Sequence, residues 1–349
     1  MKTYEYIFAA IIMVAILLAA VFLTGISPPL YRSTSEVEQL KMAAQKIMAQ
    51  ILLSPGEPDD WGENITVRAS DLSSLGLAVS TVFTREAFTL DPDKVQRLNR
   101  DLEALYLQPE TVLRLLSLSA DYGIKIEFIP ALHISVNSGD SQVSVKVLTE
   151  QGMPASYVNV TLGAFRVQEG RMESRVVRLN DTDGDGVCVA SFNSFDPEVL
   201  IAVANYFGIQ MANVSVFSSH RGYLIGSFLL VDKSLSLLEN SALQIFAVRS
   251  GSLEGSLTLM GVACDLMEWS NAPINNYKVY NMSYVEPNIV AVAALTEDNK
   301  LVVAHKVVPK SYSSIAGEVY PPLSYTLERS IKIGFSTYTL KLTVWRMVW

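Results

Sequence analysis

The sequence predicts an α+β, mainly β fold, with an N-terminal transmembrane helix and an amphipathic helical stem before an immunoglobulin-like β-sandwich and a second all-β domain. Three observations predict it. Residues 7–26 are almost wholly apolar, residues 37–51 repeat apolar side chains at helical spacing, and the chain beyond Gly123 alternates with period two. The expected units are an anchor (1–30), a helical stem with a short strand (31–137), the sandwich (138–218) and the C-terminal β domain (219–349).

The anchor is predicted from the segment IFAAIIMVAILLAAVFLTGI, residues 7–26, which has no charged side chain. A helix of this length spans about 30 Å, the thickness of a bilayer's hydrocarbon core. The alternative is a cleaved signal peptide, whose apolar core is about 7–15 residues and ends in a small-residue cleavage site. We expect an uncleaved, single-pass anchor in the cell membrane, ended or kinked at Pro28-Pro29.

Several features predict that the bulk of the chain is extracytoplasmic. A long downstream domain translocates largely regardless of flanking charge. The net charge of −8 and the absence of a basic cluster exclude a nucleic-acid partner. Five N-x-S/T triplets are candidate glycosylation sites, with ordinary turn or strand residues as the alternative. Their asparagines are Asn64, Asn159, Asn180, Asn213 and Asn281.

The stem helix has a narrow apolar seam. Val37, Leu40, Ala44, Ile47 and Ile51 step by three and four residues and therefore lie on one face. The seam predicts packing either on the chain's own globular domain or on a neighbouring helix. In the second case these residues form an assembly interface, in which the small Ala44 permits close helix approach.

Local signals place further elements. Asp91-Pro92 and Gln108-Pro109 predict the starts of two short helices. From Gly123 the apolar residues alternate with polar ones, which indicates a half-buried strand. Short strands separated by turn residues then predict the sandwich, and Glu297-Asp298-Asn299-Lys300 predicts a hairpin turn.

The segment Asp181-Thr182-Asp183-Gly184-Asp185-Gly186 matches the first six positions of a calcium loop. Asp181, Asp183 and Asp185 are the candidate ligands, since three carboxylates suit one hard cation. Phe192 stands where such a loop needs a bidentate Glu. A plain hairpin turn is therefore the favoured interpretation, calcium the alternative, and no other cofactor is expected.

Cysteines and histidines give no catalytic signature. Cys188 and Cys264 permit one disulfide, with two separate buried thiols as the alternative. His133, His220 and His305 lie far apart in the sequence, and no motif joins them to a nucleophile. We expect no enzyme activity. The alternative is a membrane-tethered exported hydrolase with its site in the C-terminal β domain.

Three short motifs carry a family resemblance. The segment 52–62 has a leucine pair, a Pro-Gly turn and Trp61; Gly76-Leu77-Ala78 follows, and then Leu90 to Lys94. This order over residues 1–135 resembles archaeal type IV pilin-like surface proteins. The resemblance implies a membrane-anchored subunit or accessory of a surface assembly, without catalysis.

The chain departs from the pilin pattern in two ways. Residues 1–6 contain no short basic leader for a processing peptidase, and the β half is larger than a simple pilin head. Glu5 matches the acid that processed pilins pair with a neighbour's amino terminus, and an interfacial Glu is the alternative. The resemblance therefore implies an accessory pilin-like protein for assembly or adhesion, with pilin-like subunits, a pilus-type platform or a second copy as partners.

Overall fold

The computed structural model confirms a mainly β protein with several sheets. Residues 2–7, 9, 10, 22–35, 104, 242 and 257–263 are described by their backbone alone. The structure describes residues 2–80, 88–118, 122–139, 142–192, 195–238, 242–248, 257–263, 266–270, 272, 274–282, 288–314 and 323–347.

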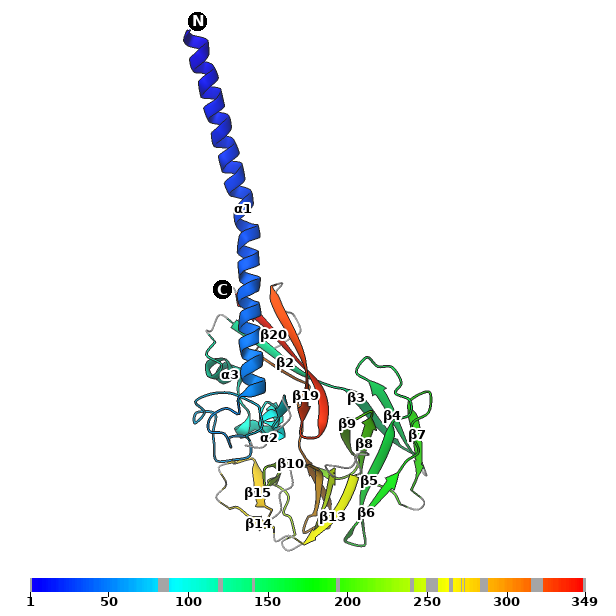
Figure 1. The fold of residues 1–349 in the computed structure, drawn as a ribbon. Coiled ribbons are helices and arrows are strands. Elements are labelled where there is room, and N and C mark those ends of the chain that lie inside the picture. The colour runs from blue at the N-terminus through cyan, green and yellow to red at the C-terminus, as the bar shows by residue number, and fades with distance from the viewer. Residues whose placement is uncertain are drawn as a thin grey trace.

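Helix α1 (Lys2–Leu53) is one long helix whose N-terminal half projects away from the rest of the molecule (Figure 1). It passes through Pro28-Pro29, where the sequence predicted an end or a kink, so it does not end there. The φ angle of proline, about −65°, is compatible with a helix even though each proline removes a hydrogen bond. No helix among the described residues is both long and apolar enough to span a membrane.

The C-terminal half of α1 packs on a five-stranded sheet of order β1-β19-β20-β2-β18. Strand β20 runs antiparallel to β2, from the pair Tyr122 and Arg346 to the pair Pro130 and Tyr338. Both ends of the chain thus share one core. The strands are β1 (Thr89–Leu90), β2 (Tyr122–Pro130), β18 (Ser311–Ser313), β19 (Ser324–Ile333) and β20 (Ser336–Arg346).

This sheet changes the expected division of the chain. The hairpin β19–β20 was expected in a separate C-terminal domain of residues 219–349, yet it completes the sheet of the stem. Residues 131–310 leave this sheet after β2 and return to it at β18. The stem is therefore built from two distant parts of the sequence.

The first β unit outside the stem is a sandwich of two sheets that enclose a shared apolar core. Their orders are β3-β4-β7 and β6-β5-β8-β9. The sandwich begins at β3, a few residues before the boundary expected at 138. Its strands are β3 (Leu132–Ser138), β4 (Gln142–Thr149), β5 (Asn159–Gln168), β6 (Arg171–Arg178), β7 (Val187–Ser191), β8 (Val199–Tyr206) and β9 (Ile209–Val216).

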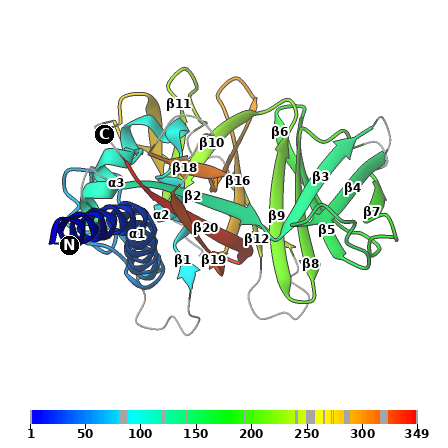
Figure 2. The same ribbon diagram turned by 90° about the horizontal axis from the view of Figure 1, so that it is seen from above.

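The second β unit is a mixed sheet of order β13-β12-β16-β17-β10-β11-β15-β14, in which β10 and β17 are parallel. One face has its own core, and the other packs on the outer face of β5 and β8. Figure 2 shows the sandwich at one side of this sheet. The strands are β10 (His220–Ile225), β11 (Phe228–Asp232), β12 (Ala242–Val248), β13 (Leu257–Ala263), β14 (Met267–Glu268), β15 (Tyr277–Asn281), β16 (Ile289–Leu295) and β17 (Leu301–His305).

Short helices join the stem to the eight-stranded sheet. Helix α2 (Pro92–Gln96) begins after Asp91, whose carboxylate accepts the N–H of Asp93, and α3 (Pro109–Leu115) begins after Gln108. Both starts confirm the sequence prediction. Between them lies the 3-10 helix η1 (Arg100–Leu105), which packs with Ile65 against β11 and β15.

Candidate functional site

The predicted seam of α1 faces the chain's own core. Leu40, Ala44, Ile47 and Ile51 are fully buried in the cluster that includes β19 and β20. As an assembly interface these four residues are therefore a wrong prediction, because the five-stranded sheet already covers them. Val37 is 40% exposed, and the side chain of Glu5 lies outside the described residues.

The N-terminal half of α1 presents apolar side chains to its surroundings. We call residues 8 and 11–21 the apolar half of α1. Contiguous exposed apolar surface of this kind marks a contact with a membrane or a protein. Its large exposed side chains are Phe8, Ile11, Ile12, Met13, Val14, Ile16, Leu17, Leu18 and Val21.

The three motifs that resemble pilin-like proteins meet at the C-terminal end of α1. The ammonium of Lys94 is fully buried and donates to the carbonyl oxygens of Pro55 and Ala78, each at 3.0 Å. The indole N–H of Trp61 also donates to the Pro55 oxygen, at 3.0 Å. Leu77 donates its N–H to the carbonyl of Ile51, near the last turn of α1. The motifs therefore hold the end of α1 in place.

Two buried cations stabilise this junction by hydrogen bonds to carbonyl groups. Burial lowers the pKa of Lys94, partly offset by the carboxylate of Asp91. Burial also lowers the pKa of Arg97 to about 10. The Arg97 guanidinium donates to the carbonyls of Trp61, Val67 and Leu105 and lies over the Trp61 ring. The Arg97 guanidinium stays charged at neutral pH, and both side chains connect segments of the stem through these hydrogen bonds.

Helix α2 also connects the stem to the eight-stranded sheet. The carboxylate of Asp93 accepts from Lys306 at 2.7 Å and from the N–H of Gly226 at 3.1 Å. The buried Gln96 amide donates to the carbonyl of Leu224 and accepts the N–H of Val307. The stem and the sheet are thus joined by paired, buried polar groups.

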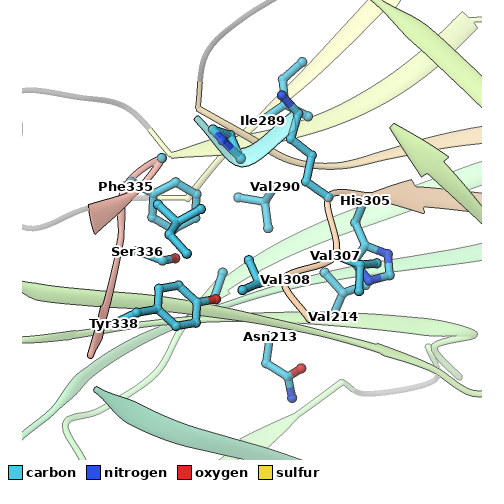
Figure 3. Close-up of a pocket in the computed structure, with 15 residues that line it drawn as sticks. Asn213, Val214, Ile289, Val290, His305, Val307, Val308, Phe335, Ser336 and Tyr338 are labelled. Atoms are coloured by element: carbon cyan, nitrogen blue, oxygen red, sulfur yellow. The ribbon is translucent and has the colours of Figure 1, made fainter. Parts of the chain in front are cut away.

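A hollow of about 230 Å³ lies where β9, the strands β16 and β17, and the β19–β20 turn meet (Figure 3). A second hollow of about 520 Å³ shares Asn213, Val308 and Tyr338 with it. Burial lowers the pKa of His305 to about 4, and burial raises the pKa of Tyr338 to about 12. Both side chains are therefore neutral at pH 7.

This hollow supplies no nucleophile and base in contact. His305 Nδ1 is buried without a hydrogen-bond partner in the described part of the chain. A hydrolase of the serine or cysteine type needs a nucleophile hydrogen-bonded to its base. The exported hydrolase stays an untested alternative.

The predicted calcium ligands form a turn. Asp183 Oδ1 accepts the backbone N–H groups of Asp185, at 3.0 Å, and Val187, at 2.9 Å. This is how a carboxylate closes a hairpin turn by itself. Within the described residues, no group of three His, Cys, Asp or Glu side chains is placed to hold a metal ion. The geometry favours the turn at Asp181, Asp183 and Asp185.

Cys188 is a free, buried thiol whose sulfur lies 3.8 Å from the carbonyl of Val145. Burial raises its pKa to about 11, so it is an unreactive thiol. Cys264, its predicted disulfide partner, lies outside the described residues. The environment of Cys188 matches the alternative of a separate buried thiol.

The five predicted glycosylation sites differ in exposure. Asn180 and Asn281 are exposed, whereas Asn159 is half-buried at the start of β5. The Asn64 amide donates to Asp60 at 2.9 Å. The Asn213 amide donates to the carbonyl of Ile134 at 2.8 Å and so joins β9 to β3. Asn180 and Asn281 are thus the best-placed acceptors.

Comparison with known proteins identifies no family. No family model matches the chain, and no curated protein matches it. Among solved structures, the chain is similar to invasin, a bacterial integrin-binding protein, at 11% sequence identity and a TM-score of 0.16. The match covers 61% of this chain and 54% of that chain. Function is therefore inferred from the geometry of this chain.

Proposed function

We propose that this chain is an accessory, pilin-like surface protein without catalytic activity. In this proposal the apolar half of α1 anchors it in the cell membrane. The C-terminal half of α1 holds the head, and the immunoglobulin-like sandwich and the eight-stranded sheet lie outside the cell for assembly or adhesion. One observation carries the proposal: a single helix has exposed apolar side chains in the apolar half of α1 and packs one face of its residues 40–52 into the core of the head.

The energetic reason lies in the exposed apolar side chains. Each large apolar side chain moved out of water contributes about 1.5–3 kcal/mol. The apolar half of α1 presents nine such side chains, so burial in lipid or among neighbouring helices gives a large favourable free energy. The same helix continues into the head and so joins the β units to the anchor.

The strand order of the sandwich supports the immunoglobulin-like assignment. Its first, second and fifth strands form one sheet, and its third, fourth, sixth and seventh strands form the other. Such sandwiches present loops at both ends and are common in cell-surface proteins. Adhesion or assembly is therefore a suitable use for this unit.

A flotation experiment tests the anchor. The full chain, purified in detergent, is mixed with liposomes and separated on a density gradient. We expect the wild type to float and Ile12→Asp/Ile16→Asp to remain at the bottom, because charges at these positions oppose insertion. Met42→Asp is the matched control, since Met42 is 63% exposed in the half of α1 that packs on the head. Equal flotation of all three proteins contradicts the proposal.

A crosslinking experiment separates a membrane anchor from an assembly surface. A photoreactive residue at Val14 is irradiated in native membranes, with one at Met42 as the control. We expect crosslinks from Val14 to a second copy or to pilin-like subunits. A chain that floats but gives only lipid adducts from Val14 would keep the anchor and refute the assembly role.

A further inference from the structure

A hollow of about 360 Å³ opens on the eight-stranded sheet, beside the place where η1 packs on it. It is lined by Phe228, Met267, Glu268, Trp269 and Asn281. This volume is at the lower end of the range that holds small ligands, roughly 300–1,000 Å³. One lining residue, Asn281, also begins the triplet Asn281-Met282-Ser283. The site of attachment and the hollow therefore coincide.

Strand register explains why they coincide. Asn281 on β15 pairs with Phe228 on β11 and with Met267 on β14. Residues directly opposite in neighbouring strands project on the same face, with Cβ atoms about 4.5–5.5 Å apart. The side chain of Asn281 thus stands between two apolar side chains. A group bonded to its amide nitrogen therefore begins beside both apolar side chains.

The hollow lies where η1 no longer covers this face of the eight-stranded sheet. Two residues before Asn281, Val279 is buried beneath Leu102 and Leu105 of η1. Beyond it, Asn281 is exposed and Met267 is 67% exposed. The rings of Phe228 and Trp269 lie 5.5 Å apart at 32° and form an apolar wall beside this gap. The face ends in aromatic and aliphatic surface with nothing from the described chain over it.

We propose that this hollow seats the first sugar of a glycan attached to Asn281. The apolar C–H face of a pyranose ring suits the aromatic wall of Phe228 and Trp269, while its hydroxyl groups stay in contact with solvent on the open side of the hollow. The covalent bond removes the translational cost that a free sugar would have on binding. The inference rests on the proposed surface location, because glycosylation of this triplet requires export.

Asn180 provides the comparison within the same chain. It is also exposed and also begins an N-x-S/T triplet, but it lies beside the turn of residues 181–186 and lines none of the hollows described above. A glycan there is expected to extend into solvent. Only the glycan on Asn281 should therefore affect the stability of the fold.

The test is a double-mutant cycle on the full chain, produced in a yeast secretory pathway and trimmed enzymatically to one N-acetylglucosamine per site. Ser283→Ala removes the triplet and is expected to lower Tm by about 2–4 °C in the wild-type background. In a Trp269→Ala background it is expected to leave Tm unchanged. In a Trp269→Phe background, which keeps an aromatic ring, Ser283→Ala should again lower Tm. Two controls should leave Tm at the wild-type value: Ser283→Thr, which keeps the triplet, and Asn180→Gln.

Other outcomes overturn the inference in distinguishable ways. An equal loss of Tm from Ser283→Ala with and without Trp269, or no loss in either background, shows that the sugar does not occupy the hollow. Mass spectrometry of the native chain is a second, independent test, because it reports which asparagines carry a glycan. A glycan on Asn180 with an unmodified Asn281 refutes the inference alone, and a native chain without glycan at any triplet refutes it together with the proposed surface location.

Discussion

Lys94 Nζ lies 3.0 Å from the carbonyl oxygen of Pro55, and this hydrogen bond joins α2 to the turn that follows α1. The two residues are far apart in the sequence, and the ammonium is fully buried. The same nitrogen donates to Ala78, so one side chain holds three segments of the stem together. The end of α1, and hence the direction in which its apolar half projects, depends on this contact.

Replacing Lys94 tests that dependence. Lys94→Met keeps the length of the side chain and removes the donor, which leaves buried carbonyl groups without a partner. We expect a loss of about 3 kcal/mol in the free energy of unfolding, measured by urea denaturation. Lys41→Met on the exposed face of α1 is the control and should be neutral. A neutral Lys94→Met would show that solvent or backbone shifts replace the contact.

The seam of α1 gives a second prediction. Ile47→Asp places a carboxylate where the side chain is 1% exposed. We expect a loss of at least about 4 kcal/mol, since the charge has no partner in this core. Met42→Asp, on the opposite face of the same helix, should change stability by less than about 1 kcal/mol. If Ile47→Asp has the free energy of unfolding of the wild type but fails to assemble, the seam is an interface between subunits after all.

His305 predicts a dependence of stability on pH. Its pKa in the folded chain is lowered to about 4, first by burial and then by the positive charge of Arg221, against an ordinary value of 6.5. As pH falls below 6.5, the imidazole of His305 binds a proton in the unfolded chain but stays neutral in the folded chain. The free energy of unfolding therefore decreases between pH 6.5 and pH 4. The loss is on the order of 3 kcal/mol.

Urea denaturation at pH 7 and pH 4.5 measures this effect. His305→Gln should remove most of this part of the pH dependence, because Gln does not titrate. His133→Gln, at an exposed position, should keep the wild-type dependence. The same pH dependence in His305→Gln and in the wild type would show that His305 is not the group that titrates.

The turn at Asp183 predicts how the chain responds to calcium. Asp183→Ala removes the acceptor of two backbone N–H groups and should cost about 1 kcal/mol. Asp185→Ala should be neutral, and Tm should be the same in calcium and in chelator. A calcium-dependent rise in Tm that disappears in Asp185→Ala would instead support metal binding by these carboxylates.

Occupancy of the N-x-S/T triplets gives a prediction that needs no mutation. Asn180 and Asn281 should be modified in the native chain, and Asn213 should not, because its amide donates to Ile134 within the fold. Tryptic peptides analysed by mass spectrometry report the occupancy. Full modification of Asn213 would mean that β9 and β3 do not form this contact in the native protein.

Much of the local structure follows from sequence pattern. The spacing of Leu40, Ala44, Ile47 and Ile51 identified the buried face of α1, and Asp91-Pro92 located the start of α2. These features depend on residues within one helical turn of each other, so they can be recognised from the local sequence. The partner of the seam was left open, because the same spacing suits a sheet in the chain and a helix outside it.

The pairing of strands that are distant in the chain could not be predicted from the sequence pattern. The alternation of Leu340, Leu342 and Val344 predicts a strand with one buried and one solvent-exposed face. These three side chains are buried, but Thr343 and Trp345 on the other face are buried as well. The alternation does not indicate that the strand pairs with β2, more than two hundred residues earlier. The hollow at Asn281 was missed for the same reason, since Phe228 and Met267 become its neighbours only through strand register. The sequence feature that could have indicated this hollow was the presence of aromatic residues close in sequence to the glycosylation triplet at Asn281.

The return of the chain to the stem sheet has a mechanical consequence. The sandwich and the eight-stranded sheet are joined covalently to the stem at two places, after β2 at Ala131 and again before β18 near Lys310. A pulling force on these outer units divides between two backbone segments that enter adjacent strands of one sheet. To detach them, the force must shear β2 and β18 from the sheet together, so a cut in either connection alone leaves the outer units tethered to the anchor.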